Sequence, residues 1–497
     1  MKLRKIAILL ALLMLASSLA SCSGTETTET ADTTASENTA AATETEPETE
    51  PDPFAEMDFG GQDIRMLVSN QDKNGRIFST FAVISNEEGL TGETLDDTIY
   101  NRNKTVEEAL NITFKIEKKE WNETSAIIPK VVAAGDNVYD FYTCDLNLLL
   151  GHVQSGCDLN VVNIESLELD QPWWNKTAID SISIGDAIYA FLGDLHTGYF
   201  ESHNTVAFNK DILTDLGLAD PYEHVYEGTW TLDVMIDMMN TAKTDTNGDA
   251  KWTVEDQYGL SMFEGNWSIA FITGANQFLV QKDENNLPVW GGVSETFLNA
   301  YEKVAGGIFN EKSNNAINAT GSLPGDLELY RLMFIHDRVL FLVTQIGVLK
   351  NMRDVEFELG VVPSPKNDEA QNDYVSLIFQ GANSFGIPVT NPDPERTGMV
   401  LNYLAAHSTE TVRKTYMEQT LDFKYIQDKQ SQEMLDIILS TGTFEIACVY
   451  DWGGISGTIM GQLNNGKTEI ASMVAKLDKV INKAMEKTIK TFAEVGQ

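Results

Sequence analysis

Residues 63–68, with the sequence DIRMLV, begin the pattern that decides the fold class. We expect this stretch to form a first strand. A helix is predicted to begin at Thr94, followed by a second strand over residues 112–116. A second helix over residues 127–134 then precedes a third strand over residues 139–143. The alternation β-α-β-α-β predicts an α/β fold with a parallel sheet whose two faces are covered by helices.

The chain beyond this pattern is too long for one hydrophobic core. Residues 54–497 exceed the length that a single core usually organises, so two lobes are expected. The second lobe is predicted to begin near residues 205–208. Thr231 is expected to cap a helix whose methionines fill the core. The last element is predicted to be one long helix over residues 468–492.

Residues 1–21 have the features of a secretory signal peptide. A basic start precedes an apolar run from Ile6 to Leu15, which is too short to span a membrane. The segment ends in the sequence LASC, residues 19–22, which resembles a bacterial lipobox. In a lipobox the cysteine takes a lipid, so Cys22 is the expected lipidation site; the alternative is an ordinary signal peptide with a chance cysteine. We expect lipid anchoring to the outer face of the cell membrane.

Residues 22–53 are predicted to form a disordered acidic linker. After Cys22 the segment holds nine acidic side chains and no Lys, Arg or aromatic residue, so it cannot bury enough surface to fold. The whole chain has 35 Lys and Arg against 74 Asp and Glu, a formal net charge of −39. Such an acidic surface argues against nucleic acid and anionic lipid as partners. Cys144, Cys157 and Cys448 can form at most one disulfide and lack metal-site spacing.

A polar loop over residues 245–256, DTNGDAKWTVED, matches a calcium-binding pattern. Ca²⁺ takes a shell of several oxygens, and three clustered carboxylates would repel one another without a cation. The pattern departs from the usual one at Ala250, where glycine is common, and in the short side chain of its last ligand. The alternative is a polar loop closed by a capping box between Thr253 and Asp256. We expect a structural calcium ion and no organic cofactor, with the ligands Asp245, Asn247, Asp249, the carbonyl of Lys251, and Asp256.

Two tryptophans lie in polar, glycine-containing stretches typical of exposed loops. They are Trp452, in DWGG at residues 451–454, and Trp267, in EGNW at residues 264–267. A flat indole can stack on the apolar face of a sugar ring while carboxylates and amides bind the hydroxyls. Any single tryptophan is more often part of the core. These two are nevertheless the predicted sugar-stacking candidates.

Seven short segments occur in an order that is typical of one family. They are PWWN at 172–175, YAF at 189–191, FNKD at 208–211, GTWT at 228–231, DQYG at 256–259, DRVLF at 337–341 and LGVVPSPK at 359–366. With the lipobox, they resemble the extracellular solute-binding lipoproteins of carbohydrate-type ABC importers (family 1-like). The resemblance covers roughly residues 59–495.

The resemblance implies a two-lobed periplasmic-binding-protein-like fold of type II, with the ligand cleft between the lobes. Lobe 1 would comprise residues 54–190 plus 360–425, and lobe 2 residues 195–355 plus 430–497. Loops that follow strands at the lobe edges are the expected places for ligand contacts. The ligand-binding residues placed in this way are Asp145, Glu201, His203, Trp267, Gln380, Asp451 and Trp452.

The implied function is capture of a sugar or oligosaccharide outside the cell and its delivery to the membrane subunits of an ABC importer. The protein would be a monomer without catalytic residues. A peptide or another polar solute would fit the same kind of cleft. Two alternatives stay open: a membrane-anchored surface glycoside hydrolase that uses two carboxylates, and a non-catalytic adhesion or scaffold protein without a small-molecule cleft.

Overall fold

A computed structural model shows the chain as two compact units, residues 1–52 and residues 53–497. All described residues belong to the second unit. They are residues 57–70, 89–262, 267–310, 316–318, 329–352, 355–421 and 428–495. The predicted signal peptide, the lipidation site Cys22 and the acidic linker lie outside them and stay predictions.

The first sheet has the predicted β-α-β-α-β order. Its strands lie in the order β12-β3-β1-β2, and β1 is parallel to both β2 and β3. The α/β prediction is therefore confirmed for this sheet. The fourth strand, β12, comes from much later in the chain and pairs antiparallel with β3. The elements are β1 (Gln62–Asn70), α2 (Thr94–Leu110), β2 (Ile112–Glu120), α3 (Trp121–Ala134), β3 (Phe141–Asp145) and β12 (Asn383–Gly386).

The second sheet is built from the middle of the chain, in the order β10-β4-β9-β5-β8. β5 is parallel to β8 and β9, whereas β4 is antiparallel to β9 and β10. The predicted lobe boundary at residue 360 is displaced, because it falls inside β10, which hydrogen-bonds to β4 in this sheet. The strands are β4 (Asn204–Asn209), β5 (Tyr258–Met262), β8 (Ala316–Asn318), β9 (Val339–Gln345) and β10 (Leu359–Val362).

Apolar burial explains why these strands form. Every residue of β4 and β9 is buried, as expected for central strands that are covered on both faces, whereas β2 at the edge is mostly half-buried or exposed. α9 (Leu232–Ala242) begins after Thr231, whose hydroxyl accepts a hydrogen bond from the backbone N–H of Val234. Three methionines of α9 are buried. The predicted cap and the predicted methionine core are both confirmed.

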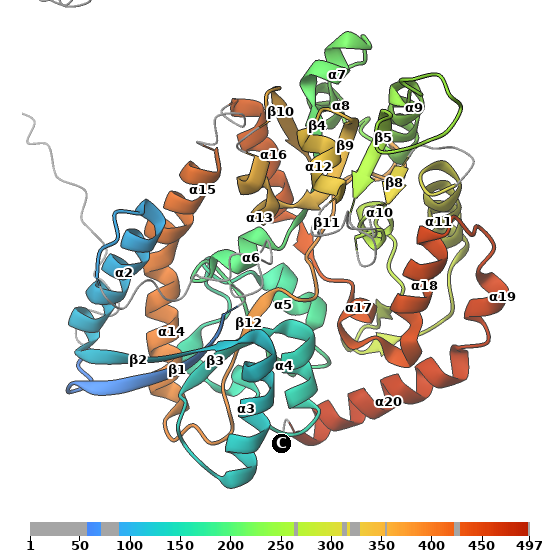
Figure 1. The fold of residues 1–497 in the computed structure, drawn as a ribbon. Helices are drawn as coiled ribbons and strands as arrows, with labels where there is room; N and C mark the ends of the chain where they lie inside the picture. Colours follow the sequence, from blue (N-terminus) through green and yellow to red (C-terminus); the bar gives the residue numbers. More distant parts are fainter. Residues whose placement is uncertain are drawn as a thin grey trace, which may run out of the picture. The chain divides into compact units, whose positions relative to one another are not determined.

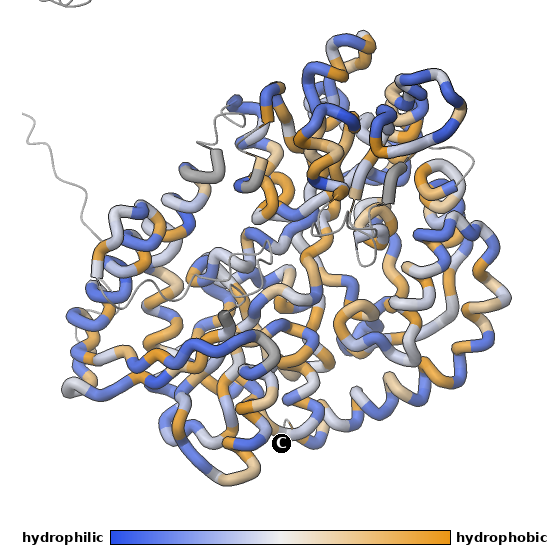
Figure 2. Tube along the Cα trace, viewed as in Figure 1, coloured by the Kyte–Doolittle hydropathy of each residue, from blue (hydrophilic) through white to orange (hydrophobic). Residues whose placement is uncertain are grey.

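The long helix predicted over residues 468–492 is wrong at its beginning. The structure has a short helix, α19 (Ala471–Val474), and a separate helix, α20 (Asp478–Val495). The indole N–H of Trp290 donates to Asp478 at 2.9 Å and holds the start of α20. The turn between the helices lets Val474 and Ile481 both reach the core. Along α20, hydrophilic and hydrophobic residues alternate, as expected for a helix with one buried face (Figure 2).

Two segments carry the chain between the sheets. The first contains α6 (Thr197–Glu201) and leads into β4. The second leaves β10, passes through β11 (Ser376–Leu377) and enters β12. α6 and β11 lie between the strands of the first sheet and those of the second (Figure 1). β11 also pairs parallel with β13 (Gly442–Thr443), so a C-terminal strand takes part in this connection.

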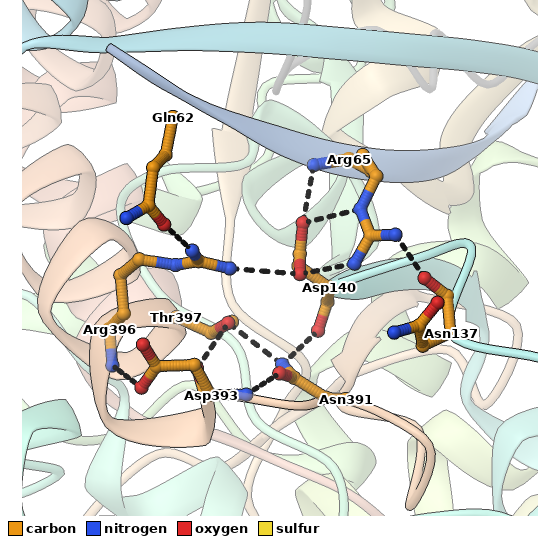
Figure 3. Close-up of polar contacts among 8 residues, drawn as sticks. All are labelled: Gln62, Arg65, Asn137, Asp140, Asn391, Asp393, Arg396 and Thr397. Atoms are coloured by element: carbon orange, nitrogen blue, oxygen red, sulfur yellow. Dashed lines mark hydrogen bonds and ion pairs between the residues drawn. The ribbon is translucent and has the colours of Figure 1, made fainter. Parts of the chain in front are cut away.

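A buried carboxylate ties the first sheet to α14 (Pro394–Ser408) (Figure 3). Asp140 accepts hydrogen bonds from the Arg65 backbone N–H at 2.7 Å, from its Nε at 3.1 Å and from its Nη2 at 2.9 Å. Arg396 of α14 donates to the same carboxylate at 3.3 Å. Bonding to Asp140 raises the pKa of the Arg65 guanidinium. The Asp140 side chain is fully buried, and Arg65 and Arg396 form ion pairs with it.

We predict that Asp140→Ala lowers the free energy of unfolding by about 3 kcal/mol, because it leaves two partly buried guanidinium groups without their carboxylate. Asp63→Ala is the matched control. Asp63 lies 3.8 Å from Lys115, and both side chains are more than half exposed, so the loss should stay below about 1 kcal/mol. Urea denaturation measures both, and equal losses would contradict the role given to Asp140.

Candidate functional site

Both sheets present strand ends to the region of the connecting segments. β3 ends at Asp145, whose partner in β12 is Asn383. β9 ends at Gln345, whose partner in β4 is Asn204. In open α/β sheets, ligands bind beside the carboxyl ends of strands. This edge is therefore the candidate site, and the chain places polar residues at each of these positions.

Backbone hydrogen bonds join these strand ends. The N–H of Phe379 donates to the Ser202 carbonyl at 3.0 Å, and the N–H of Ile346 donates to the His203 carbonyl at 3.0 Å. The N–H of Asn147, just beyond β3, donates to the Gln380 carbonyl at 3.3 Å. We call the resulting set of side chains the junction cluster. It consists of Asp145, Glu201, His203, Asn204, Gln345, Gln380 and Asn383.

Glu201 is the last residue of α6 and is buried. Its carboxylate lies 3.8 Å from the ammonium of Lys350. It packs against Gly347, where an added Cβ would come within 2.7 Å of the Glu201 Cβ. Glycine at 347 therefore lets the backbone after β9 approach α6 closely. Lys350 therefore places a positive charge near the Glu201 carboxylate.

Several buried polar atoms of the junction cluster have no hydrogen-bond partner among the described residues. They are the Asn204 Oδ1, the Gln345 Oε1, the His203 Nε2, and both side-chain polar atoms of Asn383. A buried polar group without a partner destabilises a folded protein by about 1–3 kcal/mol. Native proteins tolerate few such groups, and each calls for an explanation. These atoms make the junction cluster a candidate place for a polar ligand.

The histidines near the cluster are uncharged at neutral pH. Burial lowers the pKa of His203 to about 4, although bonding to the carbonyl of Tyr199 opposes this. Burial, with the nearby Arg102 charge, lowers the pKa of His196 to about 3. His196 precedes α6 and packs edge-on against Phe385. The cluster thus offers amides, neutral imidazole and carboxylates, a set suited to hydroxyl groups.

The structure brings together four of the seven predicted ligand residues. Asp145, Glu201, His203 and Gln380 belong to the junction cluster. Trp267, Asp451 and Trp452 lie elsewhere. The prediction did not include Asn204 and Asn383, which begin β4 and β12, or Gln345, which ends β9. A polar residue next to a run of apolar residues is visible in the sequence. It points to a site only when the structure shows where each strand begins and ends.

Trp452 does not have the surroundings of a sugar platform. It is only 3% exposed, and its indole N–H donates to Thr488 of α20 at 2.9 Å. Its ring stacks on Tyr450 at a centroid distance of 4.8 Å. The predicted stacking role is therefore wrong in this structure, because α20 covers the residue. The glycine-rich sequence around Trp452 had indicated an exposed loop.

The other two predicted residues also have local roles. Asp451 has a left-handed backbone with φ of 43° and accepts the N–H of Ser456 at 3.0 Å at the start of α18 (Ile455–Asn464). Trp267 is buried and meets Tyr330 edge-on at a centroid distance of 5.6 Å. The three residues before Trp267, part of its predicted loop, lie outside the described residues. Neither residue joins the junction cluster.

The predicted calcium loop closes through its own backbone. Asp245 accepts the N–H groups of Gly248 at 2.8 Å and Ala250 at 2.7 Å, while Asn247 and Asp249 accept the N–H two residues ahead. Ala250 adopts φ of 61°, the conformation for which glycine is common at this position. Calcium binding by these residues stays a prediction.

Asp256 has a different role from the predicted one. Its Oδ1 accepts the N–H of Thr246 at 3.0 Å, and its Oδ2 accepts the N–H of Thr253 at 2.7 Å. These bonds close the base of the loop as the capping alternative expects. In the part of the chain that the structure describes, no three His, Cys, Asp or Glu side chains form a metal-holding group.

Cys144, Cys157 and Cys448 are buried and free.

The described helices include none that is long and apolar enough to cross a membrane.

No protein-family model and no curated protein matches the chain. Solved structures do match in fold. An ABC substrate-binding protein from Listeria monocytogenes in complex with cycloalternan has a TM-score of 0.51 at 15% identity, over 87% of this chain and 99% of that one.

Two further solved structures are similar in fold. A cyclo/maltodextrin-binding protein complexed with maltotetraose has a TM-score of 0.54 at 12% identity, over 90% of this chain and 98% of that one. A sugar transporter protein from Rhizobium etli in an open conformation has a TM-score of 0.52 at 12% identity, over 87% and 99%. The chain therefore has the two-lobed, periplasmic-binding-protein-like α/β fold of type II that was predicted.

Proposed function

We propose that this protein captures a sugar or oligosaccharide outside the cell and delivers it to the membrane subunits of an ABC importer. The observation that carries the proposal is the junction cluster. It gathers amide, carboxylate and neutral imidazole groups between two sheets and leaves several of them without partners among the described residues. The fold supports the proposal, since the similar solved structures include proteins bound to cycloalternan and maltotetraose.

Binding by this mechanism requires no covalent step. Asp145 and Asn383 belong to the first sheet, while Asn204 and Gln345 belong to the second. A ligand that contacts both pairs at once favours the closed arrangement of the sheets over an open one. Carboxylates accept hydroxyl hydrogens, and an amide both donates and accepts. A neutral polyhydroxylated ligand therefore satisfies the cluster without adding charge.

The alternative is a surface glycoside hydrolase. Asp145 and Glu201 lie in the same cluster, and two carboxylates are what that chemistry needs. Incubation with a panel of neutral oligosaccharides separates the two functions. A binding protein returns the oligosaccharide unchanged, whereas a hydrolase releases shorter products. An adhesion or scaffold protein would show neither binding nor cleavage of soluble oligosaccharides.

We predict that Asn383→Ala weakens oligosaccharide binding tenfold to a hundredfold, about 1.4–2.7 kcal/mol, because it removes a buried hydrogen-bonding amide. The melting temperature of the empty protein should hardly fall, since the amide has no partner among the described residues. Calorimetric titration with the tightest-binding member of the panel measures the first effect. Thermal denaturation measures the second.

Asn391→Ala is the matched control for that experiment. The Asn391 amide donates to the Asp140 carbonyl at 2.7 Å and to Thr397 at 2.8 Å, away from the junction cluster. This variant should lose stability and keep its affinity. If Asn383→Ala instead loses stability and binds like the wild type, the amide is structural and the site lies elsewhere.

The proposal includes lipid anchoring through Cys22 at the outer face of the membrane, which rests on the sequence. We expect Cys22→Ser to move the protein from the membrane fraction to the soluble fraction with an unchanged circular dichroism spectrum. Fractionation and immunoblotting measure this change. Membrane attachment that survives the substitution would contradict the lipobox interpretation.

We also propose that the loop over residues 245–251 binds a structural calcium ion. Asp245, Asn247, Asp249 and the Lys251 carbonyl would hold it, while Asp256 closes the loop base. Asp249→Ala should then lower the melting temperature in calcium and have little effect in chelator. Asp256→Ala should lower it in both conditions. Equal losses for Asp249→Ala with calcium and with chelator would show a capped turn without an ion.

A further inference from the structure

A polar depression lies apart from the junction cluster, and the proposed function does not use it. It has a volume of about 680 Å³ and lies between the end of α10 (Ile269–Gly274), the start of α11 (Glu295–Gly307) and the loop over residues 367–375. Six of the described residues that line it carry amide side chains: Asn276, Gln277, Asn299, Asn367, Gln371 and Asn372. No Lys, Arg or aromatic residue is among the described residues that line it.

Gln371 fixes the loop that forms one wall. Its Oε1 accepts the N–H of Asn367 at 3.0 Å, and its Nε2 donates to the carbonyls of Gly274 and Asp373, both at 2.8 Å. Lys366 adds a bond from its ammonium to the Gln371 carbonyl at 2.9 Å. The wall is thus tied to the last residue of α10. A wall held before binding loses less conformational entropy when a ligand arrives.

The lining restricts the chemistry of the ligand. An amide side chain can offer two N–H donors and a carbonyl acceptor, which matches neighbouring hydroxyl groups, although the Gln371 amide is already used in holding the loop. Asn367 also keeps its buried Oδ1 without a partner among the residues described around it. Asp368 and Asp373 are the charged residues of the lining, so an anion would meet repulsion and no opposing cation. The absence of aromatic side chains from the described lining disfavours a flat apolar ligand.

We propose that this depression is a second binding site, selective for a neutral polyhydroxylated ligand such as a sugar. It is separate from the junction cluster but close to it along the chain. Val375 lines the depression, and Ile378 forms a bridge with His203. Three residues span at most roughly 11 Å, so one short segment connects the two sites. The second site uses different side chains and does not require ligand in the cleft.

The test counts bound ligands on the full chain by native mass spectrometry, with maltotetraose as the neutral probe and tetragalacturonate as the anionic one. We expect two maltotetraose molecules on the wild type. Asn299→Ala with Asn372→Ala should remove one binding event or weaken it at least tenfold. Both residues are exposed, so the variant should fold. Asn482→Ala, an exposed asparagine on α20, is the control and should bind two. Tetragalacturonate should not compete for the second event.

The outcomes separate this proposal from the proposed function. If the double variant binds two maltotetraose molecules with unchanged affinity, the second site is refuted. Equal binding of the anionic and neutral probes at the second event would refute its assigned chemistry. A wild type that binds only one molecule, and whose double variant still binds it equally well, would refute the second site. If Asn383→Ala leaves both events unchanged while the double variant removes one, the junction assignment fails and the second site stands.

Discussion

The antiparallel pairing of β12 with β3 is the interaction on which the rest of this structure depends. Asn383 pairs with Asp145 across 238 positions of the chain, so the end of the first sheet is completed by a strand that arrives from the second. Once β12 is in place, the residues just before it run beside Ser202 and His203, and their backbone groups pair there. A buried backbone segment must have such partners. The same bonds that join the sheets therefore also assemble the polar side chains between them.

Several side chains at this junction have polar atoms without a hydrogen-bond partner among the described residues. By contrast, the buried carboxylate of Asp140, just before β3, accepts hydrogen bonds from two arginines and ties β1 to α14. The amides of Asn204, Gln345 and Asn383 have unused hydrogen-bonding capacity that the described residues do not fill. Stability alone would favour apolar residues at such positions. Their polarity is better explained by a ligand that completes their hydrogen bonds, which is the physical basis of the proposed sugar capture.

Charge distinguishes the possible ligands of this protein. A chain with a formal charge of −39 repels anions at long range, and burial keeps His196 and His203 neutral at the junction. The depression beside α10 and α11 also lacks a positive charge among its described lining residues, which include amides and two carboxylates. Both places therefore favour neutral, hydroxyl-rich molecules. They differ in construction, since one lies between two sheets and the other is formed by two helices and a loop.

The sequence by itself determined the features that arise from neighbouring residues. The β-α-β-α-β order, the Thr231 cap and the buried methionines of α9 follow from local periodicity and capping, which act over a few residues. Asp145 and His203 were predicted as ligand residues from sequence, because a polar residue near a strand end is visible locally, and that role stays a prediction. Asn383 was missed, because its importance comes from β12 pairing with a strand far away in the chain. Trp452 was predicted to be exposed, because its stretch of sequence is rich in glycine. In the structure α20 covers it, and Thr488 of that helix, 36 residues later, accepts its N–H. Which residues are buried and which polar groups lack partners depends on contacts between distant segments, and those contacts exist only in the tertiary structure.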